Sequence, residues 1–217
     1  MSLHRPAHHP SEDLLLAYAS GAADEAIGLI AAAHLAYCAA CRLRSRELEA
    51  FGGSLLQELA PVPMSDGALD AVLLKLDGIK PFERPKRPAS KDGTPAMLRS
   101  YIGGDLSDVR WRRIGPRLSY VPLLRRDGVT ARLLRGVPGA ATGAHRHAGL
   151  EYTLVLKGGF SDETGSYAPG DLQVMEGDMR HNPVADPGED CINLSVTTGP
   201  LRFESLLQRI VAPLFGF

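Results

Sequence analysis

The chain has 217 residues, of which 44% are hydrophobic and 23% are charged, and its formal net charge is −1. This length and composition are ordinary for a soluble protein with two small domains. The longest apolar stretch, residues 26–33, is too short to cross a bilayer and no cleavage site follows it, so we expect a cytoplasmic protein without a membrane partner. Three cysteines cannot form an even set of disulfides, which favours metal ligation in a reducing compartment.

Residues 1–80 have a helical pattern of apolar positions and predict a domain of four helices. Ser11 is expected to cap the first helix, with acidic residues in its first turn. The second helix is expected to run from residue 24 towards residue 34. The third is expected to begin near Cys41 and to break at the paired glycines 52 and 53.

The fourth helix is expected at residues 66–76. Its apolar residues form a stripe that is either the core of a bundle or a contact surface for a partner: Leu69, Val72, Leu73 and Leu76. Residues 1–80 hold six Lys/Arg against ten Asp/Glu, a net charge of −4. Nucleic-acid affinity rests on cationic side chains, so we expect no direct nucleic-acid partner but a basic protein surface.

The spacing His34-x3-Cys38-x2-Cys41 brings one imidazole and two thiols together. His34 and Cys38 lie one helical turn apart, and the two-residue gap to Cys41 lets a chain reversal present both sulfurs to one ion. Such ligands suit a closed structural Zn²⁺ site, although all three could be ordinary core residues. The fourth ligand must come from elsewhere, and His9, directly before the first helix, is preferred over the other N-terminal histidines, His8 and His4.

Residues 81–98 are expected to form a Pro-rich linker. Four prolines fall within residues 80–95, and few side chains there suit burial. The linker divides the chain into an N-terminal domain (residues 1–80) and a C-terminal domain (residues 99–217).

The C-terminal domain changes to short strand-like runs separated by Gly, Pro and Asp turns, which predict a sandwich or barrel. Here the spacing His145-x-His147-x3-Glu151 places three side chains on one side of a strand. His181 is expected to complete the set from a facing strand. Imidazoles with a carboxylate suit Zn²⁺ or another divalent transition metal, whereas solvated loop histidines are the alternative.

Cys191 lies in an apolar predicted strand. A redox-sensing thiol needs exposure and a lowered pKa. We therefore interpret Cys191 as a core residue.

The segment from His9 to Gly21, together with Ala33 to Arg42, resembles the zinc-binding anti-sigma domain, whose motif is a distant His followed by His-x3-Cys-x2-Cys. In that family a helical bundle binds an extracytoplasmic-function sigma factor and hides the surfaces that engage RNA polymerase. The resemblance implies that four residues hold Zn²⁺ and that the stripe of the fourth helix contacts sigma. The implied zinc ligands are His9, His34, Cys38 and Cys41.

The C-terminal domain resembles a cupin. The first cupin motif is matched in full by Gly139-x5-His145-x-His147-x3-Glu151-x6-Gly158. The second motif departs from its usual form, because Met175 stands where proline is usual and an extra residue precedes His181.

The combination of a zinc anti-sigma domain, a Pro-rich linker and a cupin resembles the ChrR-type anti-sigma factors over essentially the whole chain. The resemblance implies an α + β two-domain fold, with a four-helix zinc-binding bundle followed by a double-stranded β-helix barrel. It also implies an anti-sigma factor that inhibits an extracytoplasmic-function sigma factor. The metal-binding cupin would be needed for release in response to singlet oxygen or other oxidants.

The alternative is a metal-dependent cupin oxygenase or isomerase fused to a zinc-binding interaction domain, because the same ligands hold catalytic metals. A catalyst needs a positioned acid or base and a substrate cavity. The acidic cluster closest in sequence, Asp162 and Glu163, is interpreted as part of a turn. We therefore expect a regulator rather than an enzyme, and the absence of a recognisable basic recognition helix disfavours DNA binding.

Overall fold

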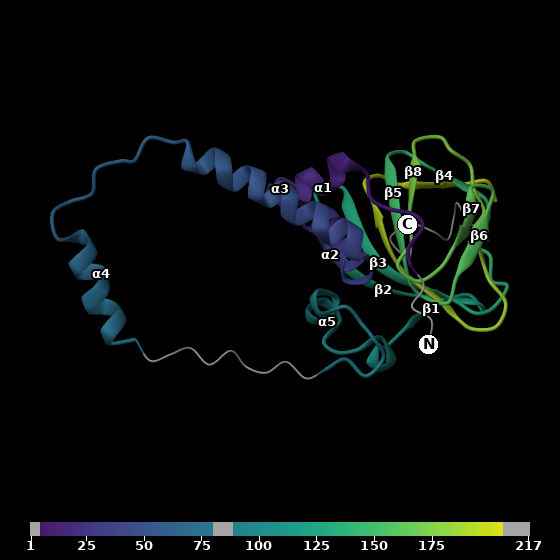
Figure 1. Cartoon of the computed structure of the whole chain (residues 1–217). Coiled ribbons are helices and arrows are strands. Elements are labelled where there is room, and N and C mark those ends of the chain that lie inside the picture. Colours follow the sequence, from purple (N-terminus) through teal and green to yellow (C-terminus); the bar gives the residue numbers. More distant parts are fainter. Residues whose placement is uncertain (1–4, 80–88, 206–217) are drawn as a thin grey trace.

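The computed structural model describes residues 5–79 and 89–205. Figure 1 shows helices gathered against one side of a β-barrel, with one further helix standing apart. The helices in chain order are α1 (Glu12–Ala19), α2 (Glu25–Tyr37), α3 (Ala39–Gln57), α4 (Ala68–Asp77), α5 (Ala96–Ile102) and the short 3₁₀ helix η1 (Leu106–Asp108). The strands are β1 (Arg112–Ile114), β2 (Leu118–Arg126), β3 (Val129–Gly136), β4 (His145–His147), β5 (Leu150–Lys157), β6 (Phe160–Asp162), β7 (Gly165–Tyr167), β8 (Leu172–Glu176), β9 (Val184–Ala185), β10 (Cys191–Thr197) and β11 (Leu201–Phe203).

The first two helices begin where side-chain caps predict. The Ser11 hydroxyl accepts a hydrogen bond from the Leu14 N–H at 3.2 Å, and the Asp24 carboxylate accepts one from the Ala26 N–H at 2.9 Å. The predicted break in the third helix is wrong, because α3 continues through the glycines 52 and 53 to Gln57. A glycine in a helix costs about 1 kcal/mol relative to alanine, which does not end a long helix by itself.

The C-terminal region forms an antiparallel barrel, which confirms the fold class expected there. A six-stranded sheet has the order β1-β2-β3-β10-β5-β8, and two smaller sheets, β11-β4 and β7-β6-β9, complete the enclosure. Side chains of the large sheet alternate between two buried environments, as the period of two requires. On β5, Leu154 belongs to the core that includes α2, whereas Glu151 and Thr153 line a cavity inside the barrel.

The helices and the barrel share one hydrophobic core. Ile30 and Ala33 of α2 belong to the same buried cluster as Leu133 of β3, Leu154 of β5 and Leu194 of β10. The two domains expected on either side of the linker therefore do not pack separately. Short helices bury too little surface alone, so α2 covers the outer face of the sheet instead. A smaller cluster lies within the helices alone: Leu15, Leu35, Cys38 and Cys41.

The expectation of a four-helix bundle is also wrong. Helices α1, α2 and α3 pack on one another, but α4 extends away from them (Figure 1). All its described side chains except Ala68, which is half-buried, are exposed, and the predicted stripe from Leu69 to Leu76 is 48–69% exposed. In residues 5–79 and 89–205, no helix has the length and apolar character required to span a membrane.

The linker is shorter than expected at its C-terminal end. Residues 80–88 lie outside the described residues, but residues 96–102 form α5, and Leu98 is fully buried in the shared core. Before α5, the Ser90 hydroxyl and the Lys91 N–H donate hydrogen bonds to the Asp105 carboxylate, both at 3.0 Å. The expected boundary at residue 98 therefore moves towards the N-terminus, because the hydrogen bonds to Asp105 and the burial of Leu98 already make this segment part of the fold.

Candidate metal centres

The first cluster lies where three helix ends meet. His34 is in the last turn of α2, Cys38 caps both the end of α2 and the start of α3, and Cys41 lies in the first turn of α3. His9, from the segment before α1, brings its Nδ1 atom to 3.5 Å from the Cys38 sulfur and 3.4 Å from the Cys41 sulfur. One ligand atom from each of the four residues lies within 4.8 Å of all the others.

The structure also places the other N-terminal histidines. The ring of His8 packs on Tyr167, with ring centroids 4.5 Å apart, and is outside the cluster. His4 lies outside the described residues. Geometry therefore favours His9 as the fourth member, as the sequence interpretation preferred.

The polar atoms of the first cluster are suited to receive a cation. His34 is fully buried, its Nδ1 is hydrogen-bonded to the Gly170 carbonyl at 2.8 Å, and its Nε2 has no partner. A buried polar atom without a partner is costly, so Nε2 is poised for a ligand. Burial lowers the pKa of His34 to about 4, which keeps the imidazole neutral. Burial and the neighbouring Cys38 raise the pKa of the Cys41 thiol to about 12, so a bound metal must displace its proton.

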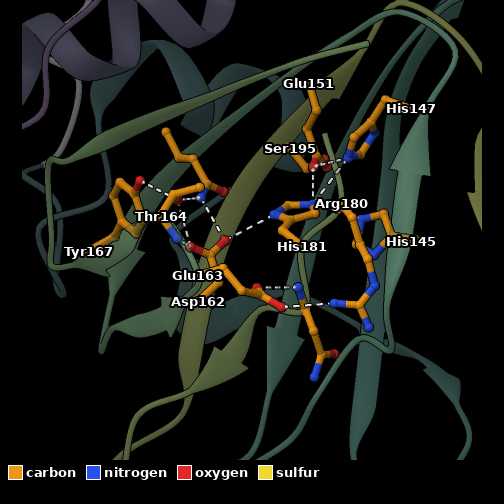
Figure 2. Close-up of polar contacts among 12 residues, drawn as sticks. His145, His147, Glu151, Asp162, Glu163, Thr164, Tyr167, Arg180, His181 and Ser195 are labelled. Atoms are coloured by element: carbon orange, nitrogen blue, oxygen red, sulfur yellow. Dashed lines mark hydrogen bonds and ion pairs between the residues drawn. The ribbon is translucent and has the colours of Figure 1, made fainter. Parts of the chain in front are cut away.

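The second cluster lies inside the barrel (Figure 2). His145 and His147 alternate along β4, and Glu151 follows at the start of β5. The Nε2 atoms of His145 and His147 lie 3.0 Å and 3.1 Å from the Nε2 atom of His181, and His147 Nε2 lies 3.1 Å from a Glu151 carboxylate oxygen. All four residues are buried, and their ligand atoms lie within 4.8 Å of one another.

His181 reaches this cluster despite the unusual spacing of its motif. The backbone of His181 pairs with that of His145 through reciprocal hydrogen bonds of 3.1 Å and 3.2 Å. The extra residue is taken up in the turn after β8, where Gly177 has a φ of +51°. Because the pairing with β4 fixes the position of His181, the turn can vary without moving the imidazole.

The surrounding residues orient the imidazoles and the carboxylate. The Nδ1 atom of His145 lies 2.8 Å from the Gly143 carbonyl, and the Ser195 hydroxyl donates to Glu151 at 2.9 Å. The Nδ1 atom of His181 lies 2.9 Å from an oxygen of Asp162 (Figure 2). Such contacts hold imidazoles in the tautomer that presents Nε2 to a metal. A set of three imidazoles and one carboxylate is compatible with Zn²⁺ and with other divalent transition metals.

The charges of this cluster are strongly coupled. Burial alone would raise the pKa of Glu151, but the hydrogen bond from His181 and the neighbouring imidazoles lower it to about 2. Burial alone would lower the pKa of His181, but its contacts with Asp162 and Glu151 raise it to about 9. Burial lowers the pKa of His147 to about 4. The cluster therefore has an ionised carboxylate and a tightly held imidazole proton that a metal can replace.

Asp162 is a site residue that the sequence interpretation missed. Its carboxylate is fully buried and accepts hydrogen bonds instead of lying in an exposed turn. Phe160 and Asp162 are alternate residues of β6, so the burial of an aromatic at one predicts that the other also points inwards. That alternation is the signal that could have identified Asp162.

Cys191 is buried beside Val155 and Phe160, and burial raises the pKa of its thiol to about 12. A reactive cysteine requires the opposite shift and an exposed sulfur. The interpretation of Cys191 as a core residue is confirmed.

A cupin-like barrel with a buried His₃Glu cluster, joined to a helical module with a His₂Cys₂ cluster, is the class that this fold and these clusters define. Residues 100–202 match the family model described as the ChrR Cupin-like domain. The Anti-sigma-E factor ChrR of Cereibacter sphaeroides is 44% identical to this chain over 209 residues, which cover 96% of this chain and 97% of that protein.

A solved structure agrees with this similarity. In the crystal structure of Rhodobacter sphaeroides SigE in complex with the anti-sigma ChrR, the matching chain is 42% identical and has a TM-score of 0.75. The match covers 88% of this chain and 99% of that chain. The chain belongs to the ChrR family of anti-sigma factors.

Proposed function

We propose that this chain binds and inhibits an extracytoplasmic-function sigma factor through its helical domain (residues 1–80), and that the metal-binding barrel (residues 99–217) is needed for release in response to singlet oxygen or other oxidants. The observation that supports the proposal is the exposed apolar surface of α4. This surface has no partner among the described residues. A relative of this chain, ChrR, has been solved in complex with SigE.

The exposed apolar residues near α4 are more numerous than the single apolar residues that are normal on a protein surface. The exposed apolar surface continues from the distal half of α3 through the connecting segment to the stripe of α4 and to Ile79, two residues beyond α4: Phe51, Leu55, Leu56, Leu59, Val62, Met64, Leu69, Val72, Leu73, Leu76 and Ile79. A helix that presents an apolar stripe to solvent gains stability when a partner covers it. The net charge of −4 over residues 1–80 favours a partner with a basic surface around that contact.

Zn²⁺ in the first cluster would be structural. His9, His34, Cys38 and Cys41 form a closed set of four ligands, which leaves no position for a substrate. The ion would tie the segment before α1 to the junction of α2 and α3. This link supports a domain whose own apolar cluster is small.

The barrel metal would be held by His145, His147, Glu151 and His181, as Zn²⁺ or another divalent transition metal. The cavity beside His145 and Glu151 has a volume of only about 50 Å³, which is room for a few water-sized molecules. The nearby carboxylate of Asp162 is occupied by His181 and Gln173 and lacks the free position of a general base. These features support a regulatory role over enzymatic turnover.

The contact with sigma can be tested on α4 without disturbing the fold. Leu73→Glu places a charge in the stripe, and we expect it to weaken binding of the co-purified sigma factor by at least about 30-fold, as for a central apolar contact. Leu74→Glu is the matched control, because Leu74 is the same residue type and is also exposed (74% against 48% for Leu73) but lies on the other side of the helix from the stripe. Affinity is measured by calorimetry. Equal affinities for the two variants would contradict a contact through the stripe.

The proposed ligands of the barrel metal can be tested at His181, which comes from the irregular second cupin motif. We expect His181→Ala to lose the barrel ion, because one of three imidazoles is removed from a buried site. Metal content by elemental analysis is the measurement. Arg180→Ala is the control, since this neighbouring side chain is exposed and pairs with Glu204. Unchanged metal content in His181→Ala would mean that water or another residue supplies the fourth ligand.

A further inference from the structure

The two clusters lie in different parts of the fold, but one turn of the barrel contacts the surroundings of both. This turn, residues 168–171, joins β7 to β8. We propose that the turn and the residues flanking it, Tyr167 to Gln173, position ligands in both clusters, so that a disturbance at the barrel cluster loosens metal binding at the His/Cys cluster. The inference rests on the proposed metal sites and extends them to their regulation.

The first half of the connection runs from the barrel cluster to the turn. The Nδ1 atom of His181 lies 2.9 Å from Asp162, whose same oxygen accepts a hydrogen bond from the Gln173 side chain at 2.7 Å. That Gln173 nitrogen also lies 2.8 Å from the Thr164 hydroxyl, which in turn lies 2.8 Å from the Tyr167 hydroxyl. Asp162, Thr164 and Tyr167 are drawn together in Figure 2. Residues at both ends of the turn are thus tied to one metal ligand.

The second half runs from the turn to the His/Cys cluster. The Asp171 carboxylate accepts the backbone N–H groups of Ala7 and His8 at 2.6 Å and 3.0 Å, directly before His9. The His8 carbonyl accepts the Leu172 N–H at 3.1 Å, and the His8 ring packs on Tyr167. The chain that delivers His9 is therefore anchored to the barrel rather than to the helices alone.

His34 is held by the same turn. Its Nδ1 atom is hydrogen-bonded to the Gly170 carbonyl at 2.8 Å, so Gly170 fixes which nitrogen faces the sulfurs. Gly170 has a φ of +94°, and a Cβ atom there would lie 2.8 Å from side-chain atoms of both Pro6 and Tyr37. This close approach, together with the backbone pairing of the turn to Val155, leaves little room for the turn to shift independently.

The direction of the effect follows from these contacts. A metal-bound His181 with an intact Asp162 holds Gln173 and Tyr167 in place, and the turn then presents the Gly170 carbonyl and the Asp171 carboxylate to the His/Cys side. When the barrel cluster is altered, the hydrogen bonds that orient His34 and the segment before His9 lose support. Contacts of this kind around metal ligands are each worth about 10- to 100-fold in metal affinity.

Cobalt substitution can separate the two sites, because only the His/Cys cluster has thiolates and only its Co²⁺ gives a thiolate charge-transfer absorption. The full-length protein is loaded with Co²⁺ and challenged with EDTA, and the decay of that absorption gives the release rate. We expect Asp162→Asn and Gln173→Leu to accelerate release by about fivefold or more, although neither residue touches a thiolate. Ser161→Ala is the matched control on β6, since its hydroxyl bonds Ser166 and Asp186 outside the connection.

The outcomes are distinguishable. If all proteins show the thiolate absorption and both variants release Co²⁺ at the wild-type rate, the coupling is wrong but the metal sites are not contradicted. A wild-type protein without thiolate absorption would overturn the His/Cys metal site and the coupling together. Far-ultraviolet circular dichroism checks that the variants are folded, and Tyr167→Phe, which removes only a hydroxyl, is expected to accelerate release in the same direction.

Discussion

Replacing Cys38 with Ser is expected to remove the metal from the helical domain and abolish sigma binding. The thiol of Cys38 is a member of the cluster and also part of the small core shared by Leu15, Leu35 and Cys41. Loss of a residue that only hydrogen-bonds to a metal ligand weakens metal binding by up to about 100-fold. Loss of the Cys38 thiolate, itself a proposed ligand, is expected to weaken Zn²⁺ binding by more than that. Because metal binding supplies folding free energy in such a domain, the junction of α2 and α3 loosens as well.

Zinc content, helicity by circular dichroism and affinity for the sigma factor are the measurements for this prediction. Cys191→Ala is the matched control, because it removes the remaining buried thiol from a position in the barrel core. The control is expected to retain zinc and sigma binding. A Cys38→Ser protein with full helicity, zinc and affinity would show that the cluster is an ordinary set of core residues.

Cutting the chain between residues 79 and 89 is expected to leave two pieces that remain associated. The buried residues Ile30 and Ala33 of α2 and Leu154 of the barrel belong to one continuous core, so separation exposes an apolar surface on both pieces. The nicked protein should co-elute on size exclusion and separate only in mild denaturant. Spontaneous separation on cutting would mean that the shared core contributes little.

The isolated helical piece is expected to retain part of its function. Its His/Cys cluster and the apolar stripe of α4 lie within residues 1–79, so it should still bind and silence the sigma factor. It should also melt at a lower temperature and self-associate, because the face of α2 is uncovered. Without the barrel, sigma-dependent transcription should stay low under oxidant, whereas with the full-length chain it is expected to rise. A fragment that still responds to oxidant would place the sensor at its thiolates.

Much of both candidate sites could be predicted from short-range patterns. His34 and Cys38 are one turn apart, and His145 and His147 are alternate residues of a strand, so local geometry already brings each pair together. The caps at Ser11 and Asp24 were likewise local features. Asp162 was missed because it is the last residue of a short strand, where an acidic residue resembles a turn residue, and its alternation with Phe160 was not used.

The sequence alone determined the local part of each candidate metal site, His34 with Cys38 and His145 with His147, because spacing within one helical turn or one strand is set by backbone geometry. Only the tertiary structure decided that α2 shares its core with the barrel, that α4 stands free, and that the linker ends before Ser90. An amphipathic helix has one apolar face whether it packs on a helix, a sheet or a partner protein. The sequence pattern therefore cannot predict which of these the face contacts. The contact between Gly170 and His34 joins residues 136 positions apart, for which no local spacing exists.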